Sequence, residues 1–334
     1  MRRLPAEFEP QSFVQIIFPH PQTDWDPYLE EARRNFVAIA EAIARFQPCL
    51  VVCDDVAAVR ACFENEENLI FVPYTGDDTW ARDCSGITVY EDGAPRILDF
   101  TFTGWGGKFD ASRDNAMTAA LAPRYGAPVE RIEMILEGGG IESNGKGVLL
   151  TTGECLLNPN RNASMDRTAV EAALAEHFGI EKTLWLEHGY LAGDDTDSHI
   201  DTLARFISEK TIMYVQCSDT QDEHYGALQA MEAELRALRD PEGNPFTLIP
   251  LPMCAPLYYD GERLPATYAN FLIINGAVLV PVYGVDQDGE ALRIFEAAFP
   301  DREIVAVDCS VLVRQHGSLH CVTMQFPAGV TLKA

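Results

Sequence analysis

The chain has 334 residues, 47% of them hydrophobic, and its 51 acidic and 25 basic residues give a formal net charge of −26. A field of that sign repels nucleic acid and anionic membranes and attracts small cations, so neither nucleic acid nor a membrane is an expected partner. No segment reaches membrane-spanning length, and residues 1–10 lack the apolar run of a signal peptide, so we expect a cytoplasmic protein. The segments without apolar periodicity are short, which predicts one domain over residues 1–334.

The first predicted element is a helix at residues 26–43. Asp26 and Pro27 are typical of a helix N-cap and first turn. The apolar residues that follow recur at helical spacing on one face: Tyr28, Ala32, Phe36, Ile39, Ala40 and Ile43. This pattern predicts a helix packed on the core.

Short apolar runs after this helix predict strands. Two of them, on either side of a turn at residues 91–93, predict a hairpin. The strands are expected at 50–52, 69–72, 87–90, 97–102, 132–136, 148–152, 203–207, 211–215, 271–274, 278–282 and 304–307, and further helices at 165–178, 222–238 and 289–299. Strand pairs interrupted by helices indicate an α/β fold with mixed sheets rather than a parallel doubly wound one.

The nine cysteines are odd in number and unevenly spaced, which argues against a disulfide framework. Most are expected to be reduced and buried in apolar runs. Cys49 and Cys53 have no histidine or second cysteine pair at finger spacing, so no metal site is predicted. No phosphate-binding loop occurs, and no cofactor is expected.

Four polar segments next to predicted strands can carry chemistry: 80–83, 137–140, 199–201 and 320–323. Each places a charged or nucleophilic side chain at a strand end or in a glycine-rich turn, from which it can project into a cleft.

Within these segments, His199 and Asp201 are two residues apart, so on extended backbone both side chains point to one face. A solvated acidic loop is an equally good interpretation of this segment alone. Cys321 follows a small turn and has polar neighbours, which predicts the partial exposure and polar surroundings that a reactive thiolate requires. For a cysteine chosen at random burial is the commoner outcome, but a cysteine, a separate histidine and several acids at strand edges together favour a catalytic site.

The spacing of these segments indicates an internal repeat. Asp83 lies 54 residues before Glu137, Glu137 lies 62 before His199, and His199 lies 122 before Cys321. A unit of about 60–67 residues would occur about five times in the chain. The unit between His199 and Cys321 is expected to contribute less chemistry than the others.

Five segments, in order along the chain, resemble those of a known family: WARDC at 80–84, WGGKF at 105–109, EGGG at 137–140, DSHIDTLARF at 197–206 and HGSLHCVTMQFP at 316–327. They are similar to the agmatine deiminases, which share a family with bacterial peptidylarginine deiminases. The resemblance extends over residues 10–330. It implies the pentein fold, a five-bladed α/β propeller of ββαβ-type units around a central site, in agreement with the spacing.

The resemblance also implies roles for matching residues. Cys321 matches the nucleophile, His199 the general acid and base, and Glu137 the carboxylate that orients the histidine. Asp83 and Asp201 match the pair that binds the guanidinium.

Two more residues match the substrate's surroundings in such enzymes. Asp195, four residues before His199, matches a further acid that contacts the substrate, and Trp105 is a candidate wall of the pocket. The chain departs from the usual pattern in the loop at 315–319 and at Met324, where the family commonly has glutamine.

These residue types suit the hydrolysis of a guanidinium group. Two carboxylates can bind the planar cation and hold its carbon in front of a thiolate. Attack by Cys321 and protonation of the departing nitrogen by His199 would release ammonia and leave a covalent thiouronium, which water then hydrolyses. A dication such as agmatine suits an acidic pocket, whereas free arginine would need a base for its carboxylate, which Lys108 or Arg113 could supply. The resemblance implies agmatine as the substrate.

Other interpretations stay open at this point. Peptidylarginine is the nearest alternative substrate. A cysteine amidase or peptidase would use the same thiol and imidazole but needs an oxyanion hole more than paired carboxylates. A non-catalytic cation-binding protein could keep the acids without using the thiol. A homodimer is the expected assembly for such an enzyme.

Overall fold

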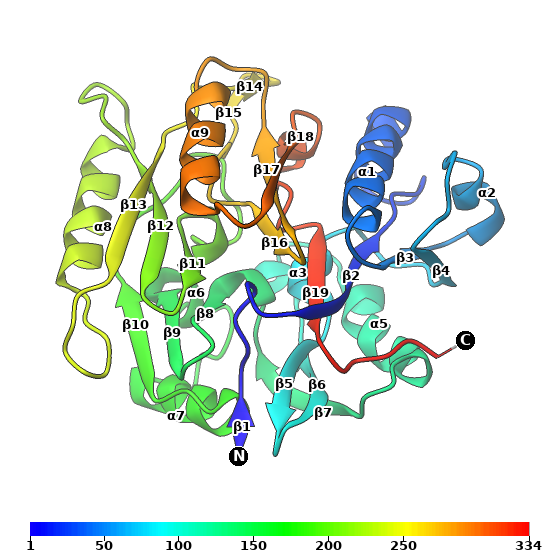
Figure 1. The fold of residues 1–334 in the computed structure, drawn as a ribbon, viewed down its shortest axis with the longest axis horizontal. Coiled ribbons are helices and arrows are strands. Elements are labelled where there is room, and N and C mark those ends of the chain that lie inside the picture. Colours follow the sequence, from blue (N-terminus) through cyan, green and yellow to red (C-terminus); the bar gives the residue numbers. More distant parts are fainter. Residues whose placement is uncertain (334) are drawn as a thin grey trace.

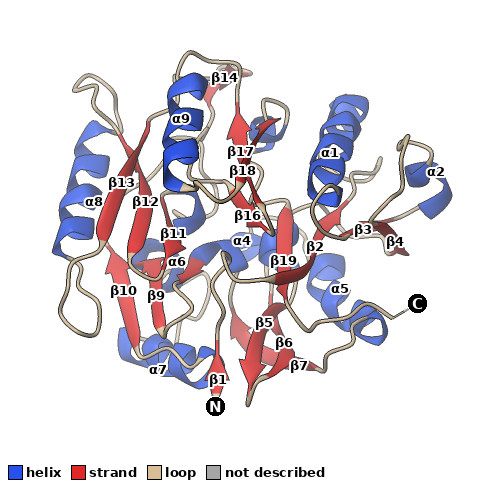
Figure 2. Ribbon diagram, viewed as in Figure 1, coloured by secondary structure: helices blue, strands red, loops and turns tan. Residues whose placement is uncertain are grey.

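The computed structural model describes residues 1–333, and five of its sheets repeat one design around a common centre (Figure 1). In each, a first strand pairs antiparallel with a second, a helix follows, and a third strand returns parallel to the second. This is the ββαβ order of the pentein propeller, so the fold expected from the resemblance and from the repeat length is confirmed. Figure 2 shows the same arrangement with helices and strands in separate colours.

The unit that begins at residue 87 shows how the sequence forms one such sheet. Strand β5 (Ile87–Glu91) pairs antiparallel with β6 (Ala94–Thr101), as the hairpin prediction requires. Asp92 and Gly93 in the turn both have positive φ, 50° and 85°, the conformation that two-residue hairpin turns favour. Helix α5 (Ser112–Leu121) then leads to β7 (Val129–Ile135), which lies parallel to β6.

Three further units follow the same order. Their elements are β8 (Ile141–Ser143), β9 (Val148–Thr152), α7 (Arg167–Phe178) and β10 (Lys182–Leu186); β11 (Ala204–Ser208), β12 (Thr211–Gln216), α8 (Tyr225–Ala237) and β13 (Thr247–Pro252); and β16 (Leu272–Ile274), β17 (Ala277–Val282), α9 (Asp288–Ala298) and β18 (Glu303–Asp308). In each, the third strand follows the helix and extends the sheet by parallel pairing. Strands β8, β10 and β13 were not predicted.

The fifth unit is built from both ends of the chain. Strand β19 (Thr323–Pro327) pairs antiparallel with β2 (Gln11–Ile17), and β3 (Cys49–Cys53) and β4 (Leu69–Pro73) extend the sheet in parallel. In Figure 1 the red β19 accordingly lies beside the blue β2. Neither strand of this terminal pair was predicted, and their pairing closes the ring of units.

Helix α1 (Leu29–Ala44) connects β2 to β3 and confirms the predicted helix: five of the six predicted apolar positions lie in it and are buried, and the sixth, Tyr28, lies just before it and is half-buried. The predicted cap is wrong. Residues Asp26–Tyr28 form a separate 3-10 turn, η1, and no side chain caps either segment. Pro27 does lie in the first turn of η1, because its fixed φ suits that position.

The remaining elements are short. They are β1 (Arg2–Arg3), α2 (Val56–Arg60), α3 (Ala81–Cys84), α4 (Gly104–Gly107), η2 (Ala122–Arg124), η3 (Gly138–Gly140), α6 (Gly153–Leu156), η4 (Ile200–Thr202), β14 (Tyr258–Tyr259), β15 (Glu262–Arg263) and η5 (Leu312–Gln315). Three of them, α3, η3 and η4, directly precede the first strands of their units. No helix among residues 1–333 is long and apolar enough to cross a membrane.

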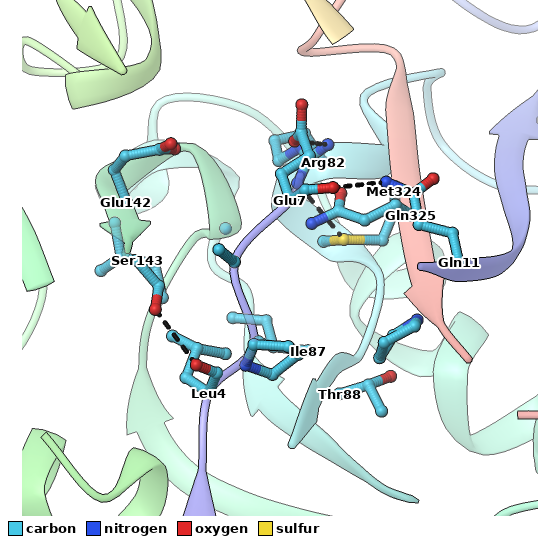
Figure 3. Close-up of a pocket in the computed structure, with 15 residues that line it drawn as sticks. Leu4, Glu7, Gln11, Arg82, Ile87, Thr88, Glu142, Ser143, Met324 and Gln325 are labelled. Atoms are coloured by element: carbon cyan, nitrogen blue, oxygen red, sulfur yellow. Dashed lines mark hydrogen bonds and ion pairs between the residues drawn. The ribbon is translucent and has the colours of Figure 1, made fainter. Parts of the chain in front are cut away.

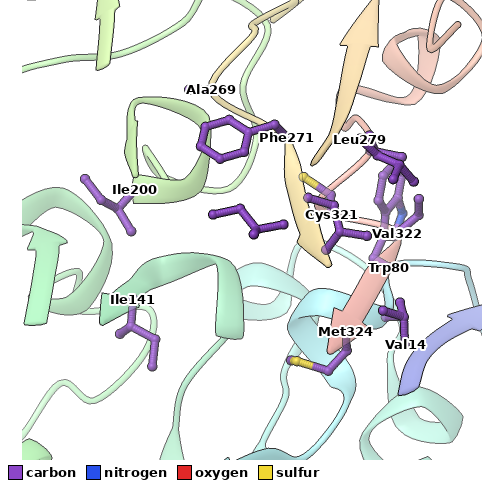
Figure 4. Close-up of a cluster of buried hydrophobic side chains, with 14 of the residues drawn as sticks. Val14, Trp80, Ile141, Ile200, Ala269, Phe271, Leu279, Cys321, Val322 and Met324 are labelled. Carbon is purple, nitrogen blue, oxygen red and sulfur yellow. The ribbon is translucent and has the colours of Figure 1, made fainter. Parts of the chain in front are cut away.

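The units meet in one continuous cluster of buried apolar side chains. Figure 4 shows its central part, to which Val14, Ile141, Ile200 and Phe271 come from four different units. Cys321 lies among these side chains, so the predicted nucleophile is at the centre of the fold. Burial there excludes water and strengthens every electrostatic interaction of the groups around it.

Candidate active site

The site is assembled from the turns that precede the first strands of the units. Asp83 comes from α3, Glu137 from the residue before η3, and His199 from the residue before η4. The His199 ring lies between the two carboxylates, with Nδ1 3.6 Å from Asp83 Oδ1 and Nε2 3.8 Å from Glu137 Oε2. Cys321 Sγ lies 3.8 Å from Asp201 Oδ2. The five residues predicted from separate motifs are therefore gathered at the centre of the propeller.

The local conformation predicted for His199 and Asp201 is wrong. Residues Ile200–Thr202 form a 3-10 turn, and Ser198 before it has a φ of 60°, so the segment is not extended. The turn directs the two side chains to different neighbours. His199 contacts Asp83 and Glu137, whereas Asp201 contacts the segment that carries Cys321.

Asp83 is fixed by two donors. Its Oδ1 accepts from the Gly139 backbone N–H at 2.9 Å, and its Oδ2 accepts from the Trp105 indole N–H at 3.0 Å. A side chain at position 139 would meet His199 Nδ1 at 2.6 Å and Asp83 Oδ1 at 2.8 Å, so this close approach requires glycine. Burial raises the pKa of Asp83, and the neighbouring His199 opposes that rise.

His199 is buried, and burial by itself disfavours its charged form. Asp83, Cys155 and Glu137 together outweigh this effect, the negative charge of Asp83 first among them, and the pKa of His199 is raised well above its usual value. The Nε2 atom has no hydrogen-bond partner. The resting ring is thus an imidazolium with a proton available to donate.

Glu137 has a second partner that sequence reasoning missed. Arg161, itself buried, donates from Nε to both carboxylate oxygens of Glu137 at 3.1 and 3.3 Å. Burial opposes ionisation of Glu137, but His199 and Arg161 outweigh it and lower its pKa. The only feature of the sequence that pointed to Arg161 was its position as a lone arginine in the polar segment 158–164.

Cys321 is buried rather than partly exposed, because only 5% of its surface is accessible. Burial raises the pKa of its thiol well above the usual value, and the charges of Asp201 and Asp83 raise it further. The resting sulfur is therefore a thiol. Asp201 accepts from His320 Nδ1 at 2.8 Å through Oδ2, while its Oδ1 is buried without a partner.

A cavity of about 210 Å³ opens above Cys321. Its lining is acidic and aromatic, with Asp24, Asp78, Asp83, Asp195, Trp80, Trp105 and Phe109. Asp195 and Trp105 thus line the cavity, as the resemblance implies, whereas Asp24 and Asp78 were not predicted. His199, Asp201 and Glu137 lie behind this lining.

The charges of the cavity wall are only partly compensated. Burial raises the pKa of Asp78 to about 7, with Asp24 and Asp114 adding to the effect. Burial and Asp194 raise the pKa of Asp195 to about 6. Carboxylates with raised pKa values beside a cavity are typical of a site that receives a cation.

Trp105 has a φ of 54°, a left-handed conformation that is rare for a residue with a large side chain. Such strain costs of order 1–3 kcal/mol and is concentrated at functional sites. The conformation places the indole N–H on Asp83 and the ring edge-on to Trp80.

Neither candidate base for a substrate carboxylate lines the cavity. Lys108 donates to Asp197 Oδ1 at 2.9 Å and to the backbone carbonyl of Asp195, and Arg113 is paired with Asp77. Among the cavity residues of the described chain, lysine and arginine are absent.

Three side chains could approach a metal ion. The ligand atoms of Glu137, Cys155 and His199 all lie within 4.8 Å of one another. Arg161, however, already donates to the Glu137 carboxylate, and its fixed positive charge opposes a second cation there.

Five ββαβ units around a buried cysteine, histidine and three carboxylates define a pentein-fold protein with the side chains of a cysteine hydrolase. The chain belongs to the Porphyromonas-type peptidyl-arginine deiminase family, whose model matches residues 3–327.

Individual relatives extend this result. An agmatine deiminase of Stutzerimonas stutzeri is 34% identical over 97% of this chain and 95% of its own. The solved structure of a C. jejuni agmatine deiminase, a cysteine-to-serine variant with bound substrate, has a TM-score of 0.94 and 39% identity, covering 98% of this chain and 97% of that one. A structure from Porphyromonas gingivalis, provisionally described as an arginine deiminase, has a TM-score of 0.95 and 50% identity over 99% of this chain and all of its own.

Proposed function

We propose that this protein hydrolyses the guanidinium group of agmatine, forming N-carbamoylputrescine and ammonia through a covalent intermediate on Cys321. The observation that carries this proposal is the cavity above the thiol, which four carboxylates line without a lysine or arginine among the described residues. Agmatine has a cation at each end, and such a lining attracts both.

Substrate binding would prepare the nucleophile. Asp83 and the unpartnered Oδ1 of Asp201 would accept from the guanidinium N–H groups and hold its carbon near Cys321 Sγ. The incoming positive charge offsets the two carboxylates that raise the pKa of the thiol. Thiolate formation, with release of the thiol proton to solvent, therefore becomes easier once the substrate is bound.

The first half-reaction then needs one proton. The thiolate attacks the guanidinium carbon, and His199, protonated at rest, donates to the departing nitrogen, which leaves as ammonia. A thiouronium cation remains bound to Cys321. Glu137, held by Arg161, stabilises the imidazolium from the side opposite Asp83.

The second half-reaction reverses the proton transfer. Neutral His199 removes a proton from water, the resulting hydroxide attacks the thiouronium carbon, and the C–S bond breaks. The hydroxyl proton of the adduct passes to the departing sulfur, so the urea-type product leaves with Cys321 again a thiol, as at rest, and His199 protonated again. Each proton and electron pair is accounted for by the two side chains, the substrate and water.

Four other substrates or roles can be compared with the same contacts. Free arginine lacks a partner for its carboxylate, since Lys108 and Arg113 are paired elsewhere. Peptidylarginine stays the second candidate, because the matching family carries that name. A cysteine amidase or a non-catalytic cation-binding protein would not need a buried imidazolium beside a guanidinium-binding acid.

The deciding experiment measures ammonia release from agmatine, free arginine and a blocked arginine peptide, by the wild type and by Cys321→Ala. Turnover of agmatine that the variant loses supports the proposal. Preference for the peptide would transfer the same mechanism to peptidylarginine. Release from none of the three would leave the binding-protein interpretation.

We further propose one catalytic domain over residues 1–334, a homodimeric assembly and a cytoplasmic location, where agmatine hydrolysis would serve polyamine synthesis or agmatine breakdown. All nine cysteines are free thiols, eight of them buried, which suits a reducing compartment. Size-exclusion chromatography with light scattering tests the dimer, and a monomer would contradict it.

A further inference from the structure

Asn270 occupies, in the unit between His199 and Cys321, the place that Cys321 occupies in its own unit. It lies two residues before the first strand, β16, as Cys321 lies two residues before β19. Its side chain is completely buried. The unit that was expected to contribute less chemistry therefore also places a polar side chain at the centre of the propeller.

The Asn270 side chain is bound to the nucleophile segment. Its Oδ1 accepts from the backbone N–H groups of His320 and Cys321 at 2.8 and 3.2 Å, and from Cys321 Sγ at 3.4 Å. Its Nδ2 donates weakly to the backbone carbonyl of Asp201 at 3.4 Å. Asn270 thus joins the turn that carries Asp201 to the turn that carries the thiol.

These contacts determine which end of the amide faces sulfur. Two backbone N–H donors require an acceptor, so rotating the amide would place its NH₂ group against both donors. The sulfur consequently faces a fixed carbonyl oxygen. An acceptor stabilises S–H and repels S⁻, because it has no proton to donate.

We infer that Asn270 is a positioning residue that holds Cys321 as an oriented, protonated thiol until a cation binds beside it. This inference rests on the proposed function for the identity of that cation, a guanidinium. Other charged groups around the sulfur contribute alongside Asn270. Asp83 in α3 and Asp201 in η4 carry negative charge. His199, directly before η4, carries positive charge beside Asp83, and His320, directly before Cys321, contacts Asp201.

Two substitutions of Asn270 are expected to shift the pH at which Cys321 ionises in opposite directions. Asn270→Ala removes the acceptor and frees the backbone N–H of Cys321, which can donate to a thiolate, while the N–H of His320 keeps its bond to the backbone carbonyl of residue 270. Asn270→Asp keeps the shape and the acceptor but adds a negative charge next to the sulfur. The alanine variant should therefore ionise Cys321 at lower pH than the wild type, and the aspartate variant at higher pH.

The experiment is iodoacetamide labelling of Cys321 across pH without substrate, followed by peptide mass spectrometry. One hydrogen bond corresponds to a shift of about one pH unit in the labelling midpoint. The matched control is Asn275→Ala, since the side chain of Asn275, in the same unit as Asn270, makes comparable hydrogen bonds to the backbone of Gln11. It should leave the Cys321 profile unchanged.

Turnover is measured in parallel. Both Asn270 variants should lower kcat for agmatine by about 10–100-fold through misorientation of the thiol, with little change in KM, because Asn270 does not line the cavity. Midpoints that move in the same direction in the two variants, or do not move, would overturn the inference. If the wild type released no ammonia from agmatine, the proposed function would fail while the labelling result still decided the role of Asn270.

Discussion

Two clusters of buried charge lie on either side of His320, and they differ in how their carboxylates are compensated. In the first, the carboxylate of Glu7 forms ion pairs with three groups: Arg205 Nη2 at 2.9 Å, His320 Nε2 at 2.6 Å and Arg82 Nη2 at 3.4 Å. Figure 3 shows Glu7 and Arg82 at the small cavity of this region. In the second, the substrate cavity, Asp78 and Asp195 have no such cationic partners among the described residues.

The pKa shifts follow this difference. Burial would raise the pKa of Glu7, but Arg205 and His320 outweigh it and lower the value. Asp78 is half-buried at the cavity wall with no cation paired to it among the described residues, and desolvation with the charges of Asp24 and Asp114 raises its pKa to about 7. A fully paired buried carboxylate is part of the structure, whereas an unpaired one beside a cavity indicates that the missing cation is the ligand.

The largest expected effect tests whether the second cluster is catalytic. Cys321→Ala should reduce ammonia release from agmatine by at least about 10⁴-fold, since no other thiol can form the covalent intermediate. The midpoint of thermal unfolding should change little, because the substitution removes one sulfur atom from a cavity wall. Residual turnover within tenfold of wild type would show that Cys321 is not the nucleophile.

The next effect concerns stability and the paired cluster. Glu7→Ala should lower the free energy of unfolding by about 3–5 kcal/mol, because it leaves the buried charge of Arg82 without its partner and removes one of the two buried carboxylates that pair with Arg205. Urea denaturation measures this. The control is Glu9→Ala at a half-exposed ion pair with Arg3, where about 1 kcal/mol or less is expected. Equal effects at both positions would contradict the distinction drawn between buried and exposed pairs.

Asp83→Asn tests whether a carboxylate of the cavity binds the guanidinium of the substrate. A charge-assisted hydrogen bond to the guanidinium contributes about 1.5–3 kcal/mol, so kcat/KM for agmatine should fall by about 10–150-fold. The same substitution at Asp222, which pairs with Arg263 away from the cavity, should leave kcat/KM unchanged. A similar loss in both variants would indicate a general effect on folding.

A smaller effect is expected at the wall of the cavity. Asp78→Asn removes the negative charge but keeps one acceptor oxygen, which can serve the indole N–H of Trp80, while the indole N–H of Trp25 keeps Thr79 Oγ1 as its acceptor. The KM for agmatine should rise about fivefold, corresponding to about 1 kcal/mol. An alkylguanidine without the terminal ammonium should be affected less. If both substrates lost affinity equally, Asp78 would act on the guanidinium rather than on the second cation.

The smallest effect is on pH dependence. The raised pKa values mean that Asp195 and Asp78 are neutral below about 6 and about 7 and charged above those values. The KM for agmatine should therefore fall by a few-fold as pH rises from about 5.5 to about 8, where both carboxylates attract the dication. The Asp78→Asn variant should show a flatter profile over this range. A KM that rises over this interval would contradict the assignment of the wall carboxylates to cation binding.

The sequence by itself determined much of this protein. Short apolar runs between turn residues encode strands such as β6 and β12, and the helical spacing of apolar residues encodes α1. Such patterns are readable in the sequence because each element has a local backbone preference and buries one face. The motif spacing predicted five repeats and brought Asp83, His199 and Cys321 to one centre. Tight turns before first strands recur at the repeat length, which is why this part of the site was predictable.

Only the tertiary structure decided the rest. Strand β19 pairs with β2 from the other end of the chain, and Arg161 and Asn270 reach Glu137 and Cys321 across 24 and 51 residues. The acids of the cavity wall and the pairing of Glu7 depend equally on distant segments. No local pattern encodes these contacts, because a buried polar side chain is stabilised by partners that the fold brings to it, and its charge state follows from those partners.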